Sequence, residues 1–193
     1  MSKITVQQGI SGTRFWAFVA IFSALLAILS TIKAPMPPPL WSISLFSLGI
    51  SIVGTLFGPK MGFLAGGIGG AVAEIYGAYG TVSGSETVIF VVSAFIAKGA
   101  AGLVIGYGRE VARALGQTQI KALAGTLAFI EALAMAFGRT VELTIFFLID
   151  TMLYGVAAAS VDYLGMLTLV TIPIALIVNE GVRRAFGRRY FDV

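Results

Sequence analysis

The sequence has no cysteine and no histidine among its 193 residues. Without cysteine there can be no disulfides, iron–sulfur clusters or thiol nucleophiles. Without histidine the commonest metal ligand and general base is missing, which excludes serine–histidine hydrolysis, rhomboid-type proteolysis and haem ligation by histidine. We therefore predict no catalytic residue, no metal and no cofactor, and we do not expect an enzyme.

Charged residues are also scarce, at 11% of the chain, against 58% hydrophobic residues. Soluble domains have roughly 25% charged residues, and the mean hydropathy here is +0.95. The length suits one membrane domain of about six spans, each of roughly 20 apolar residues. The net charge of +4 is typical of basic residues that flank spans, so nucleic-acid binding is not expected. The polar N-terminus MSKITVQQGISGTR predicts no cleaved signal peptide.

The most informative stretch is residues 57–70, which read FGPKMGFLAGGIGG. Pro59 ends a helix because it lacks an N–H group and clashes with the preceding turn. Gly62, Gly66 and Gly70 then recur every four residues and form a smooth stripe that lets another helix approach closely in lipid. The stretch predicts a helical hairpin of two spans whose turn, with Lys60, lies at the membrane surface.

Six apolar stretches are expected to be spans: about 15–32, 40–57, 61–79, 87–107, 121–138 and 164–182. The proline-rich segment KAPMPPP after the first span favours an extended path. The charged segment GREVARALGQTQ after the fourth span is interpreted as an amphipathic surface helix. Residues 140–163 are ambiguous, since they could form a seventh span, or extend the fifth helix into a reentrant or capping segment.

Charge placement favours six spans. In that arrangement ten of the 13 basic residues lie on one side, and the exceptions are Lys33, Lys98 and Arg139. Such asymmetry marks the cytoplasmic face. We therefore predict an all-α, multi-pass protein of the cell membrane. It would be a compact bundle of six transmembrane helices with both termini cytoplasmic, and one domain over 1–193 with a basic tail at 183–193.

Ionisable side chains inside spans cost about 2.5–3.5 kcal/mol each on insertion scales, and so they mark functional sites or ion pairs. Polar and aromatic groups of the outer half could line a pocket for a small molecule. The predicted lining residues are Glu74, Tyr79, Arg139, Glu142, Tyr154 and Trp41.

Structural alternatives remain open for these side chains. The aromatic residues could belong to an interfacial belt, and Arg139 with Glu142 could be a helix pair. Lys98 and Glu131 could form a structural ion pair at mid-depth. Glu180 is expected to pair with Arg183 or Arg184, one turn further on.

The first span has a small-residue pattern that includes Ala20 and Ala24. Small residues permit close helix contact. The pair could pack within the protein, or it could be a docking face for a membrane partner.

Together these features resemble the S-components of energy-coupling factor (ECF) vitamin transporters. The features are the size, six spans, the alanine-patterned first helix, the proline-rich first outer loop, the FGPKMGFLAGGIGG hairpin and a last helix entered through TIPIALIVNEG. The chain departs from nickel and cobalt members, which begin with a Met-His pair. We recognise no motif specific for thiamine, biotin or riboflavin.

The resemblance implies a substrate-binding subunit whose ligand lies in the outward half, under a lid at Lys33–Pro39. It also implies that Ala20 and Ala24 dock on a transmembrane coupling protein driven by two ATPases. Two alternatives stay open: a stand-alone oligomeric channel or facilitator for a small solute, and a membrane enzyme or scaffold that uses Glu and Asp.

Overall fold

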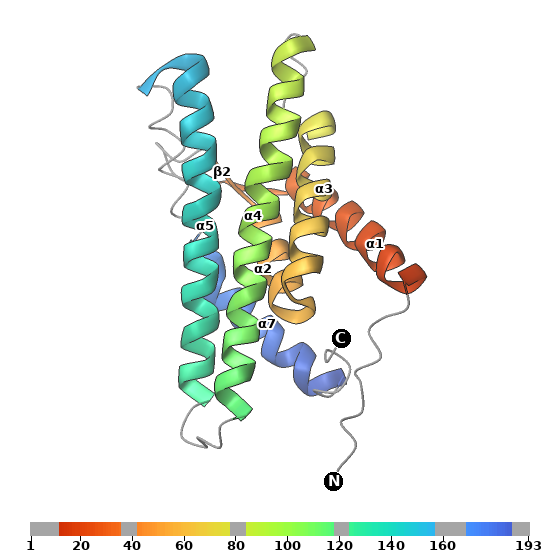
Figure 1. The fold of residues 1–193 in the computed structure, drawn as a ribbon, viewed down its shortest axis with the longest axis vertical. Helices are drawn as coiled ribbons and strands as arrows, with labels where there is room; N and C mark the ends of the chain where they lie inside the picture. The colour runs from red at the N-terminus through yellow and green to blue at the C-terminus, as the bar shows by residue number, and fades with distance from the viewer. Residues whose placement is uncertain (1–11, 36–41, 78–83, 118–123, 157–168, 187–193) are drawn as a thin grey trace.

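The computed structural model describes residues 12–35, 42–77, 84–117, 124–156 and 169–186. In that part of the chain, six helices and one two-stranded hairpin follow one another (Figure 1): α1 (Gly12–Thr31), β1 (Lys33–Pro35), β2 (Ser42–Ser44), α2 (Phe46–Phe57), α3 (Pro59–Gly77), α4 (Gly84–Gln117), α5 (Ala124–Tyr154) and α7 (Thr171–Phe186). Helices α3 and α4 form the centre, with α1 packed on α3 and α5 packed on α4. The predicted all-α bundle of six helices is confirmed.

The glycine stripe lies where α3 packs against α4, which confirms the close approach of another helix that its spacing predicts. A Cβ atom built on Gly62 would lie 2.3 Å from the Gly102 carbonyl oxygen, and one on Gly102 would lie 2.1 Å from that of Gly62. Further along α3, a Cβ on Gly66 would lie 2.8 Å from the Lys98 carbonyl oxygen. The two backbones therefore approach so closely that only glycine fits at the crossing.

The predicted hairpin turn lies between α2 and α3. Gly58 has a φ of 88°, a left-handed conformation that favours glycine. Pro59 is the first residue of α3, where its missing N–H group has no helical partner to lose. The turn is packed against α4, since a Cβ on Gly106 would lie 2.3 Å from the Pro59 nitrogen.

The second helix is shorter than predicted, because the chain before it is a β-hairpin. Strands β1 and β2 pair antiparallel, with Lys33 opposite Ser44 and Pro35 opposite Ser42. The extended path expected for KAP is confirmed, but the span predicted at 40–57 is wrong at its start. Its helix begins at Phe46 and has 12 residues, which is about 18 Å of helix against a hydrocarbon core of about 30 Å.

Two other boundaries are settled by the structure. Helix α4 runs without interruption from Gly84 to Gln117, so the helix expected at GREVARALGQTQ is present over residues 108–117 as the continuation of the fourth helix. Helix α5 runs from Ala124 to Tyr154, so residues 140–154 extend the fifth helix and are not a seventh span. The rest of the ambiguous segment, 157–163, lies outside the described residues.

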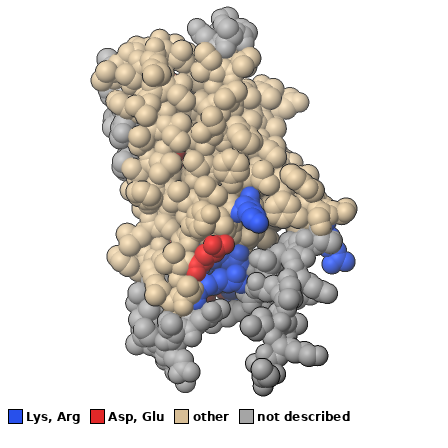
Figure 2. Space-filling model, in the orientation of Figure 1, with Lys and Arg blue, Asp and Glu red and all other residues tan. Residues whose placement is uncertain are grey.

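Three of the described helical segments are long and apolar enough to cross a membrane: Gly12–Thr31, Thr87–Leu115 and Ala128–Tyr154. The start of α1, the α2–α3 turn, the last turns of α4 and the end of α7 lie toward one end of the bundle (Figure 1). One face shows its charged side chains gathered in the lower part, while its upper part is almost uniformly uncharged (Figure 2). On this face the charged side chains of the described residues therefore lie toward one end of the bundle, and the cytoplasmic orientation of that end stays a prediction.

Candidate functional site

A buried ion pair joins the two central helices. Lys98 Nζ of α4 lies 2.9 Å from Glu74 Oε1 of α3, and the two side chains are only 12% and 11% exposed. Gly70 makes room for the pair, because a Cβ there would lie 2.6 Å from Lys98 Cδ. The Lys98 ammonium also lies 4.7 Å from the ring centroid of Phe46 and 5.8 Å from that of Phe146. Lys98 therefore contacts α2, α3 and α5 from its place on α4.

A second buried ion pair lies on α5. Arg139 is 2% exposed, and its Nη1 group donates to the Glu142 carboxylate. Its Nη2 group donates to the backbone carbonyl of Ser47 in the first turn of α2. The predicted helix pair is thus present, and Arg139 in addition ties α5 to α2.

Both ion pairs meet the start of α2, since Lys98 contacts Phe46 and Arg139 contacts Ser47. We call Glu74, Lys98, Arg139 and Glu142 the charged cluster. It has two acids and two bases, so its formal charge is balanced. Burying such pairs is costly unless each polar atom has a partner, and a set of this kind inside an apolar bundle is a candidate binding site.

Two atoms of the charged cluster have no hydrogen-bond partner in the described part of the chain. They are Glu74 Oε2, which is an acceptor, and Arg139 Nε, which is a donor, and both are buried. An unpaired buried polar group costs about 1–3 kcal/mol. The cluster therefore contains one buried acceptor and one buried donor that the described residues leave without a partner.

The β-hairpin is attached to the same turn of α2. Ser44 Oγ accepts a hydrogen bond from the Phe46 N–H group (3.2 Å) and donates one to the Ser30 carbonyl at the end of α1 (3.3 Å). The Leu45 N–H group donates to the Ile32 carbonyl (3.1 Å). A movement of the first turn of α2 would therefore displace both the β-hairpin and the side chains of the charged cluster.

Three of the six predicted lining residues, Glu74, Arg139 and Glu142, are brought together in the charged cluster. Tyr154 is not near them, because it follows Arg139 by 15 helical residues, or about 22 Å along α5. It is half-exposed, and its ring stacks on Phe90 with centroids 6.2 Å apart. Tyr79 and Trp41 lie outside the described residues.

The predicted pairing of Lys98 with Glu131 is wrong. Glu131 instead accepts two hydrogen bonds from Arg183 of α7, at 2.6 and 3.2 Å. A helical side chain leans toward the N-terminus of its own helix, which directs Lys98 along the antiparallel α3 toward Glu74. The glycine stripe predicts a close helix neighbour for α3, and only the structure identifies that neighbour as α4.

Sequence reasoning also missed Phe46, Ser47 and Phe146, which surround the two cations. Nothing in their local pattern distinguishes them from other apolar or small residues of a span. Only the crossing of α2 with α4 and α5 gives them this place. The expected pair of Glu180 with Arg184 is confirmed, at 2.7 Å.

The two alanines of α1 lie on its outer side. Ala20 and Ala24 are exposed, whereas Val19, Ser23 and Leu26 on the other side are buried. The same outer surface includes large exposed side chains, among them Trp16, Ile21 and Ile28. Within the described structure the alanines therefore do not pack against another helix, and they face the surroundings of the bundle.

A largely apolar six-helix bundle with a buried, charge-balanced cluster defines a membrane protein with an internal polar site. A family model described as "ECF-type riboflavin transporter, S component" matches residues 12–178. The chain belongs to this family of membrane transport proteins, and the predicted resemblance to ECF S-components is confirmed.

A solved structure supports the same fold. It is described as the S-component for biotin from an ECF-type ABC transporter, it shares 17% sequence identity, and its TM-score is 0.60. The match covers 91% of this chain and 95% of that one. Comparison with curated protein sequences gives no match.

Proposed function

We propose that the chain binds a small vitamin-like solute in the outward half of its bundle and is the substrate-binding subunit of an ECF importer of the cell membrane. The observation that carries this proposal is the charged cluster beneath the β-hairpin, in a chain of the S-component family. The residues proposed to contact the solute are Glu74, Lys98, Arg139 and Glu142. The subunit itself would catalyse no reaction.

The balance of charge favours a neutral solute. A net charge in the solute would leave an uncompensated charge beside two acids and two bases in a water-poor interior. The free acceptor on Glu74 and the free donor on Arg139 suit a planar molecule with amide-like N–H and C=O groups on one edge. Riboflavin, named in the description of the family, is uncharged and has such an edge, so it is the first solute to test.

The experiment begins with mass spectrometry of small molecules retained by the purified chain, followed by calorimetry with riboflavin and biotin. Glu74→Gln and Lys98→Gln should each weaken binding by about 1.5–3 kcal/mol, because a hydrogen bond to a charged group is lost. Glu180→Gln is a matched control, since it removes a carboxylate from an exposed pair on α7. Unchanged affinity in both folded cluster variants would place the site elsewhere.

We further propose that Ala20 and Ala24 dock on a transmembrane coupling protein that works with two ATPases. Their exposure on α1 supports this, because leucine there would hold a partner helix away. Ala20→Leu and Ala24→Leu should lower ATP-dependent uptake and leave solute binding intact, while Ala128→Leu on the exposed side of α5 is the control. Normal uptake by both variants would refute the docking role of Ala20 and Ala24. The alternative function, a stand-alone channel, would be favoured if the purified chain alone conducted ions in the presence of the solute.

A further inference from the structure

An open pocket of about 500 Å³ lies at the opposite end of α2 from the charged cluster, around the α2–α3 turn. It is formed by the start of α1, the turn itself and the second half of α4. Its lining residues are Phe15, Phe57, Gly58, Pro59, Lys60, Met61, Leu103, Tyr107, Arg109, Glu110 and Arg113. Nothing in the proposed solute site involves these residues.

Among the described residues that line the pocket, bases outnumber acids. The bases are Lys60, Arg109 and Arg113, and the acid is Glu110. Arg109 is 6% exposed, and its Nη1 atom lies 3.2 Å from where a Cβ on Gly58 would be, so its guanidinium is held against the turn. The N-terminus of α3 begins at this turn and adds the positive end of a helix dipole. The field in the pocket favours an anion.

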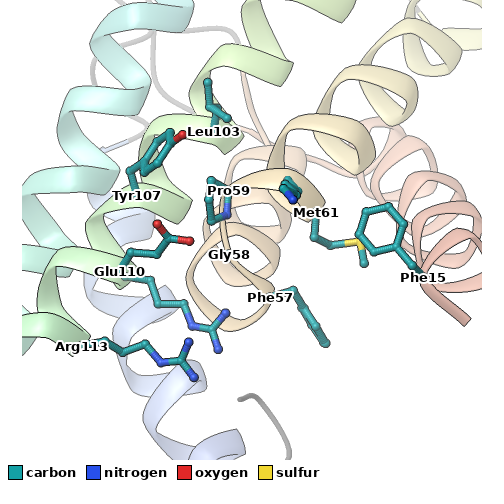
Figure 3. Close-up of a pocket in the computed structure, with 11 residues that line it drawn as sticks. Phe15, Phe57, Gly58, Pro59, Met61, Leu103, Tyr107, Glu110 and Arg113 are labelled. Carbon is teal, nitrogen blue, oxygen red and sulfur yellow. The ribbon is translucent and has the colours of Figure 1, made fainter. Parts of the chain in front are cut away.

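The other wall of the pocket is apolar. Figure 3 shows Phe15 and Met61 on the side away from Glu110 and Arg113, with Phe57 below the turn. The Phe57 ring lies 4.7 Å from that of Phe22 on α1, which continues this wall along the helix. Beyond it lies the exposed apolar side of α1. A ligand that fills the pocket would therefore have an anionic end and a hydrophobic end.

We propose that this pocket binds the headgroup of an anionic phospholipid. The phosphodiester would lie among the three basic side chains, and the acyl chains would run along Phe15, Phe57 and Met61. Glu110 would accept a hydrogen bond from a headgroup hydroxyl, which fits phosphatidylglycerol better than a multiply charged headgroup. Basic pockets between membrane helices bind anionic lipid headgroups in this way.

The location agrees with a lipid as the occupant. The pocket opens where α3 begins and α4 nears its end, at the end of the bundle where charged side chains gather (Figure 2). This is the end that we predict to be cytoplasmic, and the cytoplasmic leaflet carries anionic lipids. An acidic segment of a partner protein would be attracted by the same charges. It would not account for the apolar wall, which leads into the hydrocarbon region.

The test uses the full chain in a neutral detergent, titrated with dioleoylphosphatidylglycerol or dioleoylphosphatidylcholine. Native mass spectrometry gives the bound lipid, and the thermal unfolding midpoint gives its stabilising effect. Phosphatidylglycerol should bind and raise the midpoint, and phosphatidylcholine should not. Equal effects of the two lipids, or an equal effect of glycerol 3-phosphate, would overturn the proposal, the latter in favour of a soluble phosphate.

Variants locate the site. Lys60→Gln and Arg113→Gln should each weaken phosphatidylglycerol binding about five-fold, since one basic side chain near the headgroup is lost. Lys60 is exposed, so its variant is expected to fold. The matched control is Arg14→Gln, which removes one exposed charge at the start of α1 outside the pocket lining. Equal weakening by the control would mean non-specific charge attraction. If Lys60→Gln and Arg113→Gln leave phosphatidylglycerol binding unchanged but impair assembly on a protein partner, the occupant of the pocket is a protein segment.

Discussion

The two ends of helix α2 differ in how they hold charge. At its start, two acids and two bases form ion pairs that are buried among four helices. At its end, three bases and one acid among the described residues line an open pocket. The helix that joins these two environments has only 12 residues.

The difference indicates two kinds of ligand. A balanced and buried cluster selects by hydrogen-bond geometry, because a charged solute would leave one charge uncompensated. An open pocket with excess positive charge selects by the sign of the charge, and salt screens it more strongly. We therefore expect a neutral solute at the start of α2 and an anionic lipid at its end.

The test with the largest expected effect on this comparison determines which end of α2 faces the outside of the cell. The chain has no cysteine, so single cysteines at Ser2, Ser83 and Val193 can be labelled without background. In intact cells a membrane-impermeant reagent should label position 83 and neither of the other two. Labelling of position 2 or 193 from outside would reverse the orientation and remove the cytoplasmic leaflet from the lipid proposal.

Removal of one cluster charge should have the largest energetic effect. Arg139→Met leaves Glu142 buried without its partner, and breaking a buried ion pair in this way costs about 3–5 kcal/mol of stability. The double variant Arg139→Met with Glu142→Leu should recover most of that loss, without recovering solute binding. Thermal unfolding in detergent measures both.

The exposed residue Arg14 provides the control for this variant. Arg14→Met should change stability by no more than about 0.5 kcal/mol, as is usual for surface positions. An equally small loss of stability in Arg139→Met would mean that Arg139 and Glu142 do not form a buried ion pair. The two ends of α2 would then not differ in the way they hold charge.

A smaller loss is expected at the crossing that separates the two regions. Gly62→Ala places a Cβ 2.3 Å from the Gly102 carbonyl oxygen, and overpacking of this kind costs about 1–3 kcal/mol. Gly181→Ala on α7, where a Cβ meets nothing within 4 Å, should instead stabilise its helix by about 0.5–1 kcal/mol. Effects of the same sign in the two variants would contradict the α3–α4 packing.

The smallest effect is expected for the exposed ion pair on α7. Arg184 is 79% exposed where it contacts Glu180, and helix pairs of this kind contribute about 0.3–0.5 kcal/mol. Arg184→Gln should therefore shift the unfolding midpoint very little and leave both solute and lipid binding unchanged. A loss as large as that of Arg139→Met would show that burial does not distinguish the pairs.

Features that depend on neighbours along one helix were predicted correctly from the sequence. The Arg139–Glu142 and Glu180–Arg184 pairs follow from spacings of three and four residues, and both are present. The glycine stripe and the Gly58–Pro59 turn are equally local. Family membership also followed, because it rests on the order of such local patterns along the chain.

Features that depend on which helices meet were not predicted. Lys98 was paired with Glu131 by depth alone, whereas it contacts Glu74 across α3 and α4. The start of α2 was placed too early because its apolar residues do not show that Ser42–Ser44 pairs with Lys33–Pro35. Two residues at the same depth in the membrane are in contact only if their helices are neighbours and their side chains face each other, and depth alone gives neither.

The sequence by itself therefore determined that this is a largely apolar helical bundle without histidine or cysteine chemistry, with its helices separated by proline, glycine and basic residues. Those properties follow from composition and from periodicity along single helices. The tertiary structure alone decided that Lys98 and Arg139 meet at the first turn of α2, and that Arg109 lies against Gly58 at the other end. The reason is that the close approach at Gly62 and Gly102 sets the register between α3 and α4, and the contacts of Lys98 with Glu74 and of Gly106 with the α2–α3 turn depend on that register.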